Sequence, residues 1–213
     1  MNVSILILRL TAFFVGIVET IHARLHYRWR RLTSAVTVAR CALPGTHVYL
    51  GSGTRLKGHR HIYIHGRFVA MENNRIEAIE SHGGLHFAPK LILGDNVSME
   101  RDCHIGCINE VRIGSRVLMA SRVYIADHSH GGTTLADIRI PPNDRPVISK
   151  GSVIIEDDVW LGEGVAVMPG VRIGHSSVIG ANAVVTKDIP PFSLAVGVPA
   201  RVIKTMGPIS KHT

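Results

Sequence analysis

Residues 155–188 read IEDDVW-LGEGVA-VMPGVR-IGHSSV-IGANAV-VTKD, a run of hexads in one register. An aliphatic residue opens each hexad, glycine usually follows it, and a small or β-branched residue takes the fifth place. Each hexad therefore predicts one short strand and one tight turn, and three hexads predict one triangular coil whose aliphatic openers point inward. This pattern is typical of a parallel β-helix, an all-β solenoid in which each coil packs on the next.

The hexads extend toward the N-terminus and are interrupted in two places. They begin at Leu91–Gly94, slip by two residues after Cys107 and resume at Ile113, while residues 46–98 predict irregular early coils. A longer break follows at residues 129–146, where prolines and glycines replace the hexads. Such a protruding loop is where a solenoid usually carries its function. We therefore expect an appendage over residues 1–40, a β-helix domain over 41–205 and a tail over 206–213.

The composition agrees with a narrow solenoid and an anionic partner. Hydrophobic residues make up 46% of the 213 residues and aromatic residues 5%, and the 21 glycines are expected to serve turns with positive φ. The net charge of +8 favours an anionic partner. Because no nucleic-acid-binding motif occurs, we expect a phosphorylated small molecule and a membrane surface instead of nucleic acid. Three cysteines without a second pair predict reduced thiols in the cytoplasm and no zinc or disulfide framework.

The N-terminal segment predicts an amphipathic helix. Residues 3–18 are almost wholly apolar, but Arg9 interrupts them and the run is shorter than the ~20 residues of a membrane span. From Ile21 to Leu32 apolar residues fall on one helical stripe and arginines on a neighbouring one. We expect residues 1–32 to make peripheral contact with an anionic membrane, at the inner face of the plasma membrane. Packing on a subunit is the alternative, and a transmembrane span is the least favoured reading.

Five motifs together resemble the hexapeptide-repeat acyltransferases, and among them the sugar and surface-polysaccharide O-acetyltransferases. They are VYIADHSHG (123–131), VWLG (159–162), VMPGVRIG (167–174), IGANAVVTKDIPP (179–191) and VGVPARVI (196–203). The resemblance covers roughly residues 90–205 of the chain. It implies a left-handed parallel β-helix, a homotrimer with the acceptor cleft between subunits, acetyl-CoA as acyl donor, and direct transfer without an acyl-enzyme.

The resemblance also implies roles for individual residues. His128, at the start of the loop, is expected to be the general base, because a neutral imidazole accepts a hydroxyl proton near neutral pH. His130 is the rival base, and we expect it to contact the acceptor together with Asn109 and Asp127. No partner that orients His128 is evident, since the side chain of Asp127 would point away in an extended chain.

A second set of residues is expected to bind acetyl-CoA. Its members are Trp160, Gly162, Gly180, Ala181, Thr186, Lys187, Arg201 and Lys204. The small residues would leave room for the pantetheine arm, Trp160 would wall the cleft, and the cations would meet the phosphates. Glu163 departs from the smaller polar residue of the maltose and galactoside enzymes, which puts one cofactor contact in doubt.

The expected function is transfer of an acetyl group from acetyl-CoA to a hydroxyl of a cell-surface or lipid-linked saccharide in the cytoplasm, without a metal. The apolar and basic N-terminal segment differs from that of the soluble sugar enzymes. We therefore expect an acceptor that is held at the membrane. N-acetylation of an amino sugar or xenobiotic is the alternative. Zinc chemistry of the β-helical carbonic anhydrase type is disfavoured because His128 and His130 lack a third histidine at a plausible place. A non-enzymatic scaffold is disfavoured by the full set of cofactor-side residues.

Overall fold

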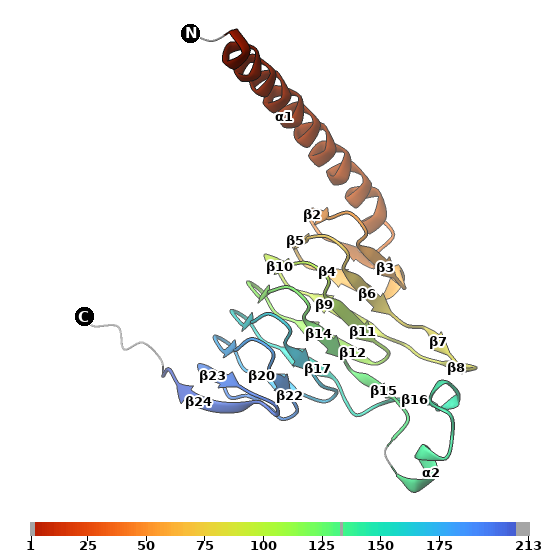
Figure 1. Cartoon of the computed structure of the whole chain (residues 1–213). Helices are drawn as coiled ribbons and strands as arrows, with labels where there is room; N and C mark the ends of the chain where they lie inside the picture. Colours follow the sequence, from red (N-terminus) through yellow and green to blue (C-terminus); the bar gives the residue numbers. More distant parts are fainter. Residues whose placement is uncertain (1–2, 133, 208–213) are drawn as a thin grey trace.

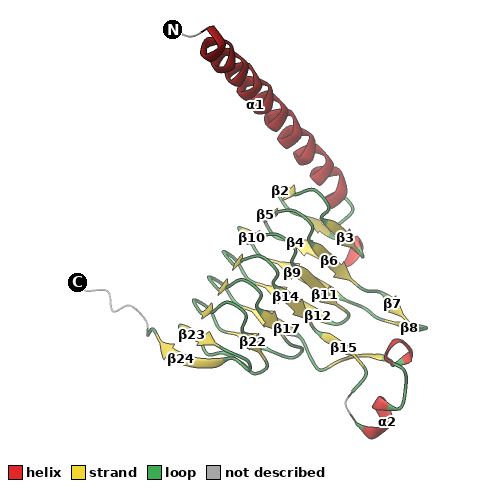
Figure 2. Ribbon diagram, in the orientation of Figure 1, coloured by secondary structure: helices red, strands yellow, loops and turns green. Residues whose placement is uncertain are grey.

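The computed structural model describes residues 3–132 and 134–207, with the side chains of residues 3–11 left out of the description. Most of the expected tail, from residue 208 onward, lies outside the described residues. Figures 1 and 2 show a stack of triangular coils with one long helix leaving its N-terminal end and a short hairpin closing its C-terminal end.

Three sheets form the sides of the solenoid, and the chain passes from sheet A to sheet B to sheet C in every coil. Within these sheets the strands pair in parallel until the last hairpin. Sheet A contains β1 (Leu43–Pro44), β4 (Ile62–Ile64), β9 (Lys90–Leu93), β12 (Glu110–Ile113), β17 (Val153–Ile155) and β20 (Arg172–Ile173). Sheet B contains β2 (His47–Leu50), β5 (Arg67–Ala70), β10 (Val97–Met99), β13 (Leu118–Met119), β18 (Trp160–Leu161), β21 (Val178–Ile179), β23 (Ser193–Val196) and β24 (Arg201–Thr205). Sheet C contains β3 (Arg55–Lys57), β6 (Arg75–Ala78), β11 (His104–Cys107), β14 (Tyr124–Ala126), β19 (Ala166–Val167) and β22 (Val184–Val185).

The hexad openers form the core, as predicted. All six openers of the quoted stretch are 0% exposed: Ile155, Leu161, Val167, Ile173, Ile179 and Val185. The fifth places are buried beside them at 0–2% exposure: Val159, Val165, Val171, Ser177 and Ala183. Each fully buried aliphatic side chain contributes roughly 1.5–3 kcal/mol to folding, so the repeat itself stabilises the stack.

The glycines that follow the openers serve coil stacking, which corrects the expectation that they adopt positive φ. A Cβ at Gly162 would lie 2.7 Å from the Ala181 nitrogen of the next coil. The left-handed positions come two residues later in the hexad, where Asn96 has φ 55°, Asp158 60° and Asn182 57°. Close approach of neighbouring backbones therefore decides the second place of the hexad.

Helix α1 (Val3–Val38) is attached to the solenoid through its C-terminal turns. The Ser34 hydroxyl, buried at 2% exposure, accepts from the Leu50 N–H at 2.8 Å. Arg30 donates to the carbonyl oxygens of Leu50 and Gly51, so this arginine anchors the helix to the first coil. Large apolar side chains remain exposed along the helix: Phe13, Phe14, Val18, Ile21, Leu25, Trp29 and Leu32. No helix in the described part of the chain combines the length and unbroken apolar character of a membrane-spanning segment.

The loop after sheet C begins and ends as a two-stranded stem. Strand β15 (His128–His130) pairs antiparallel with β16 (Val147–Ser149), and the loop between them carries α2 (Leu135–Ile138) and the 3-10 turn η2 (Pro142–Asp144). The coil stack resumes only at β17, so Val147, where the sequence predicted its return, still belongs to the loop stem. After Pro190 and Pro191 the chain rejoins sheet B as β23, and β24 pairs with it antiparallel.

Candidate active site

The larger departures from the regular coil gather at one corner, where the chain passes from sheet C to sheet A. They are the 3-10 turn η1 (His59–His61), the hairpin of β7 (Ser81–His82) and β8 (Leu85–His86), the slip at Ile108–Asn109, and the loop that starts at Asp127. Figure 1 shows the hairpin and the loop projecting from the same edge of the solenoid. This corner is therefore the irregular surface on which a site can be built.

Asp127 is the buried centre of the corner, with a relative exposure of 0%. Its carboxylate accepts from the Ile108 N–H at 2.9 Å (Oδ1) and 3.2 Å (Oδ2), and from the Asn109 N–H at 2.7 Å (Oδ2). These amides belong to the register slip, and a buried carboxylate satisfies them as buried polar groups require. The prediction that Asp127 contacts the acceptor is wrong, because its side chain has no exposed surface.

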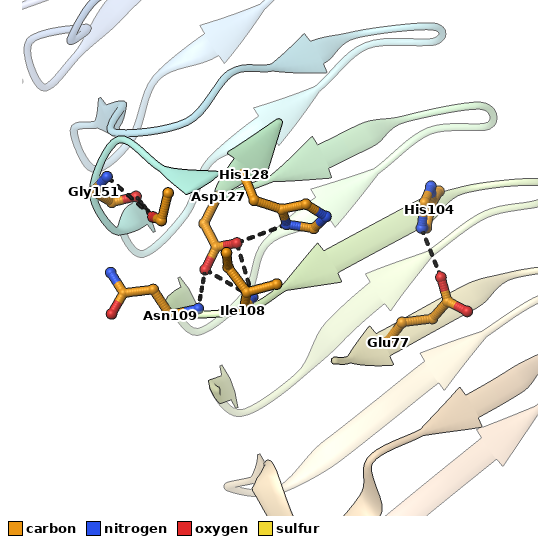
Figure 3. Close-up of polar contacts among 8 residues, drawn as sticks. Glu77, His104, Ile108, Asn109, Asp127, His128 and Gly151 are labelled. Atoms are coloured by element: carbon orange, nitrogen blue, oxygen red, sulfur yellow. Dashed lines mark hydrogen bonds and ion pairs between the residues drawn. The ribbon is translucent and has the colours of Figure 1, made fainter. Parts of the chain in front are cut away.

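The same carboxylate orients His128. The ring Nδ1 lies 2.9 Å from Asp127 Oδ1 (Figure 3). A carboxylate can only accept, so Nδ1 carries a proton, and in the neutral ring the lone pair is then on Nε2. The expectation that these adjacent side chains point apart is wrong because the chain leaves sheet C after Ala126, so strand alternation does not extend across Asp127.

Gly106 of the neighbouring strand β11 makes room for the His128 ring. A Cβ at Gly106 would lie 2.9 Å from His128 Cε1, 3.6 Å from His128 Nε2 and 3.7 Å from His104 Nε2. Two imidazoles therefore share the space over this glycine. The His128 side chain keeps 13% of its surface exposed, so it is held firmly yet open to a small group from outside.

His104 belongs to a second histidine–carboxylate pair, which the sequence reading missed. Its Nε2 lies 3.1 Å from Glu77 Oε2, and Arg75 also contacts that oxygen at 2.7 Å. Figure 3 shows this pair on the adjoining strands of sheet C, across from His128. Burial and the positive charge of Arg75 lower the pKa of His104, against the opposing effect of Glu77. His104 is thus favoured as a neutral hydrogen-bonding group. Its ring stands edge-on to Tyr124, with 5.5 Å between centroids.

The two other residues expected at the acceptor lie at the rim. The exposed His130 packs against His82 of the β7–β8 hairpin, with 5.1 Å between ring centroids. The Asn109 side chain is exposed and extends away from the His128 ring (Figure 3). Asn109 therefore contributes its backbone N–H to the site through Asp127.

The residues expected to bind acetyl-CoA lie on sheet B, at the corner between sheets B and C, and in the C-terminal coils. Trp160 is 50% exposed on the outer face of sheet B. Gly162 and Gly180 stand at the corner between sheets B and C, where a Cβ would lie 2.7 Å from Ala181 N or from Val196 Cγ1. The space beside them is filled by the next coil, so the expectation that they leave room for pantetheine is corrected. Ala181 at this corner is exposed.

The expected phosphate-binding residues gather at the C-terminal coils. Thr186 and Lys187 directly follow β22 on sheet C. The Ala200 N–H donates to the Val184 oxygen at 2.8 Å, which brings Arg201 beside this strand, and Lys204 lies farther along β24. Among the described residues, none of the three cations forms an ion pair, so their charge is available to an anionic ligand.

The three cysteines belong to the hydrophobic core. Cys41, Cys103 and Cys107 are free and buried. Burial raises the pKa of Cys41 and Cys103 to about 11, and that of Cys107 further. In residues 3–132 and 134–207, no three His, Cys, Asp or Glu side chains group as a metal site would require.

Comparisons with known proteins show what this chain resembles. The model of the bacterial transferase hexapeptide (six repeats) matches residues 152–187. Escherichia coli WbbJ, which carries the name of a lipopolysaccharide biosynthesis O-acetyl transferase, is 42% identical over 54% of this chain and 60% of its own length. The chain thus spans less than two thirds of WbbJ.

Two solved structures extend the likeness to the fold. A maltose O-acetyltransferase from Clostridium difficile is 28% identical, with a TM-score of 0.54 over 77% of this chain and 69% of that one. A galactoside acetyltransferase in complex with coenzyme A is 27% identical, with a TM-score of 0.51 over 76% of this chain and 64% of that one. The repeat, the three-sided architecture and these two structures support a left-handed parallel β-helix, and the family model shows that residues 152–187 resemble the hexapeptide-repeat transferases.

Proposed function

We propose that this protein transfers an acetyl group from acetyl-CoA to a hydroxyl of a saccharide, with His128 as general base. The observation that carries the proposal is the buried Asp127 carboxylate, which accepts from His128 Nδ1 and so directs the lone pair of the neutral ring to Nε2, at the irregular corner of the solenoid. The names of the relatives, which are sugar and lipopolysaccharide O-acetyltransferases, support the same chemistry.

The chain's own residues supply proton transfer and orientation. Acetyl-CoA, when bound, supplies the thioester carbonyl. His128 Nε2 takes the proton of the acceptor hydroxyl as the C–O bond forms, and it returns that proton to the sulfur as the C–S bond breaks. The Asp127 carboxylate stabilises the imidazolium that exists between these two events. No group on the protein becomes acetylated in this scheme.

The cofactor-side residues support a site shared between subunits. Trp160 lies on sheet B while His128 follows sheet C, so the two side chains stand on different sides of one subunit. A homotrimer in which sheet B of one subunit faces sheet C of the next would bring them together, with Ala181, Thr186, Lys187, Arg201 and Lys204 along the same cleft. Light scattering at several concentrations tests this arrangement, and a monomer would contradict it.

Acetyl-CoA binding can be tested before the acceptor is known. A ligand at ~100 times its Kd adds about 2.7 kcal/mol of stability, which for a chain of this size raises Tm by about 5–10 °C. The shift should survive His128→Ala and shrink in Lys187→Ala/Arg201→Ala. No shift at millimolar acetyl-CoA would contradict the proposal.

Ester or amide formation decides between the two acyl-transfer readings. The parent chain should acetylate hydroxyl acceptors, and the product should be cleaved by mild hydroxylamine as an ester is. His130→Ala should retain most of the activity that His128→Ala loses, because the described Asp127 contact belongs to His128. Activity confined to amine acceptors would favour the N-acetyltransferase alternative.

We also propose that α1 lies at the surface of an anionic membrane and brings the protein to a membrane-held acceptor, on the cytoplasmic side. Exposed Phe13, Ile21 and Leu25 supply the apolar contact, and Arg24 and Arg28 supply charge. Ile21→Glu/Leu25→Glu should abolish co-sedimentation with phosphatidylglycerol vesicles, whereas Leu135→Glu, at an exposed leucine of the loop helix α2, should not. Equal sedimentation of both variants would refute membrane contact and leave subunit packing.

A further inference from the structure

Sheet C continues past the site toward the N-terminal end of the solenoid, and its outer face becomes positively charged there. Strand register places His104 beside Arg75, and Arg75 beside Arg55, in one outward row. In the next row Gly106 lies beside Glu77, and Glu77 beside Lys57. The two rows lead directly from the space shared by His104 and His128 to three cations, Arg55, Lys57 and Arg75, which we name the basic strip.

The positive charge of the basic strip is only partly neutralised. Arg75 is paired with Glu77, but its side chain remains 58% exposed. Arg55 and Lys57 are exposed, and neither forms an ion pair with a carboxylate among the described residues. Glu77 is the one carboxylate of these two rows. The strip therefore keeps an excess of positive charge beside the proposed base.

On the other side of the site, the outward row that continues from His104 carries no charged side chain. Tyr124 pairs in register with Ala166, and Ala166 with Val184, so the outward row continues with uncharged side chains toward the C-terminal coils. The basic strip is thus confined to the side of His128 away from the proposed phosphate-binding cations Lys187, Arg201 and Lys204. Two separate positive regions therefore flank His128. Acetyl-CoA bound by the cations of the C-terminal coils would leave the basic strip free to bind the acceptor.

The spacing suits a saccharide. Neighbouring strands lie about 4.8 Å apart. The backbone of Arg75 on β6 therefore lies about 10 Å from the end of β14, where the loop begins, and the backbones of Arg55 and Lys57 on β3 lie about 14 Å from it. An anionic group one or two sugar units from the reacting hydroxyl would span these distances. Arginine pairs favourably with phosphate and carboxylate through its planar set of donors.

We propose that the acceptor is an anionic saccharide whose phosphate binds Arg55, Lys57 and Arg75 while its hydroxyl lies at His128. The inference rests on the proposed acetyl transfer for the position of the hydroxyl, but the basic strip alone determines the charge of the ligand. His104, held by Glu77, lies between the two ends and hydrogen-bonds the intervening sugar. The phosphate could be that of a free sugar phosphate or of a lipid-linked saccharide.

Binding and kinetics together test the inference. Calorimetry on the full chain would compare a panel of hexoses, the matching hexose 1-phosphates and hexuronic acids. Selected phosphates are expected to bind at least about tenfold more tightly than the matching neutral sugars, and this preference should fall by roughly tenfold in Arg55→Gln/Lys57→Gln. Raising the salt from about 20 mM to about 500 mM should remove most of the preference. A short-chain polyprenyl diphosphate-linked saccharide distinguishes the lipid source from the free one.

A matched control and a separate activity assay keep the outcome clear. Arg31→Gln/Arg67→Gln removes two exposed arginines near α1 and sheet B and should leave the preference for phosphate unchanged. Equal binding of neutral and phosphorylated sugars by the parent chain, or an equal loss in both double variants, would overturn the inference. Acetylation of neutral sugars alone would overturn it while leaving the proposed acetyl transfer intact. Phosphate-dependent binding without any acetyl transfer would support the basic strip and contradict the proposed function.

Discussion

Replacing Asp127 by asparagine tests how this carboxylate controls His128. The new side chain has nearly the same shape, but one of its two polar atoms donates instead of accepting. In one orientation the amide oxygen stays beside the Asn109 N–H, which lies 2.7 Å from Oδ2 in the parent, and the NH2 group faces His128 Nδ1. In the other orientation the NH2 group faces the Asn109 N–H and leaves a backbone donor unpaired, which costs about 1–3 kcal/mol. The first orientation should therefore dominate.

The favoured orientation reverses the protonation of the imidazole. The amide donates to His128 Nδ1, so the ring proton moves to Nε2, where the proposed base needs a lone pair. General-base catalysis contributes about 10²–10⁴ in rate, so kcat should fall by about that factor. The contact to the Ile108 and Asn109 amides survives in weakened form, and the free energy of unfolding should fall by only about 1–2 kcal/mol. That loss corresponds to a few degrees in Tm for a chain of this size.

Three measurements separate the two effects. The release of CoA thiol gives kcat, circular dichroism gives Tm, and ¹⁵N NMR of the His128 ring gives its tautomer. Asp157→Asn is the matched control, since Asp157 accepts the Ser115 N–H at 2.8 Å at a corner away from His128. The control should retain parental kcat. Parental kcat in Asp127→Asn, or a loss of kcat with the proton still on Nδ1, would refute the reasoning.

Three further perturbations test the surroundings of the site. Gly106→Ala should lower kcat at least about tenfold and change Tm by a few degrees at most. The new Cβ would lie 2.9 Å from Cε1 of the His128 ring, which Asp127 holds in place. Unchanged kinetics would show that this ring moves freely. Arg75→Gln should raise the pKa of His104 in an NMR titration, because it removes a positive charge that acts together with burial to lower this pKa. The folded-state pKa of His104 lies below the unfolded value, so the unfolded chain takes up this proton first as the pH falls below about 6.5, and Tm falls with it. Arg75→Gln narrows the difference between the two pKa values. The fall of Tm below that pH should therefore be weaker in Arg75→Gln than in the parent. The three cysteines should react with a thiol reagent at pH ~8 only after unfolding, because burial raises the pKa of Cys41 and Cys103 to about 11 and that of Cys107 further; fast reaction of the folded chain would contradict their burial.

The fold could be predicted because its cause is periodic. Ile155, Leu161 and Val167 recur at the hexad opener, and the structure buries each of them completely. The loop position followed from the break in this period. The hairpin of β7 and β8 was not recognised, because its few residues interrupt early coils whose hexads are already irregular.

The site depended on contacts that no local pattern describes. Asp127 was expected to point away from His128, and the alternation rule behind that expectation ends where the chain leaves sheet C. His104 and Glu77 meet across neighbouring strands that are far apart in the sequence. The sequence held one signal that His104 lies near the start of the loop, namely the two-residue slip after Cys107. A coil of three hexads plus these two residues aligns His104 with Tyr124. Gly162 shows the opposite error, because a residue expected to serve a ligand serves coil stacking.

Acetyl transfer with His128 as base is the central claim, and one measurement tests it most directly. Purified protein, acetyl-CoA and a panel of neutral and phosphorylated saccharides would be incubated together, and mass spectrometry would detect a product one acetyl group heavier. We predict a hydroxylamine-sensitive ester with the parent chain and His130→Ala, and a rate at least about a hundredfold lower with His128→Ala. An equally fast His128→Ala enzyme, or activity that depends on His130 instead, would contradict the account.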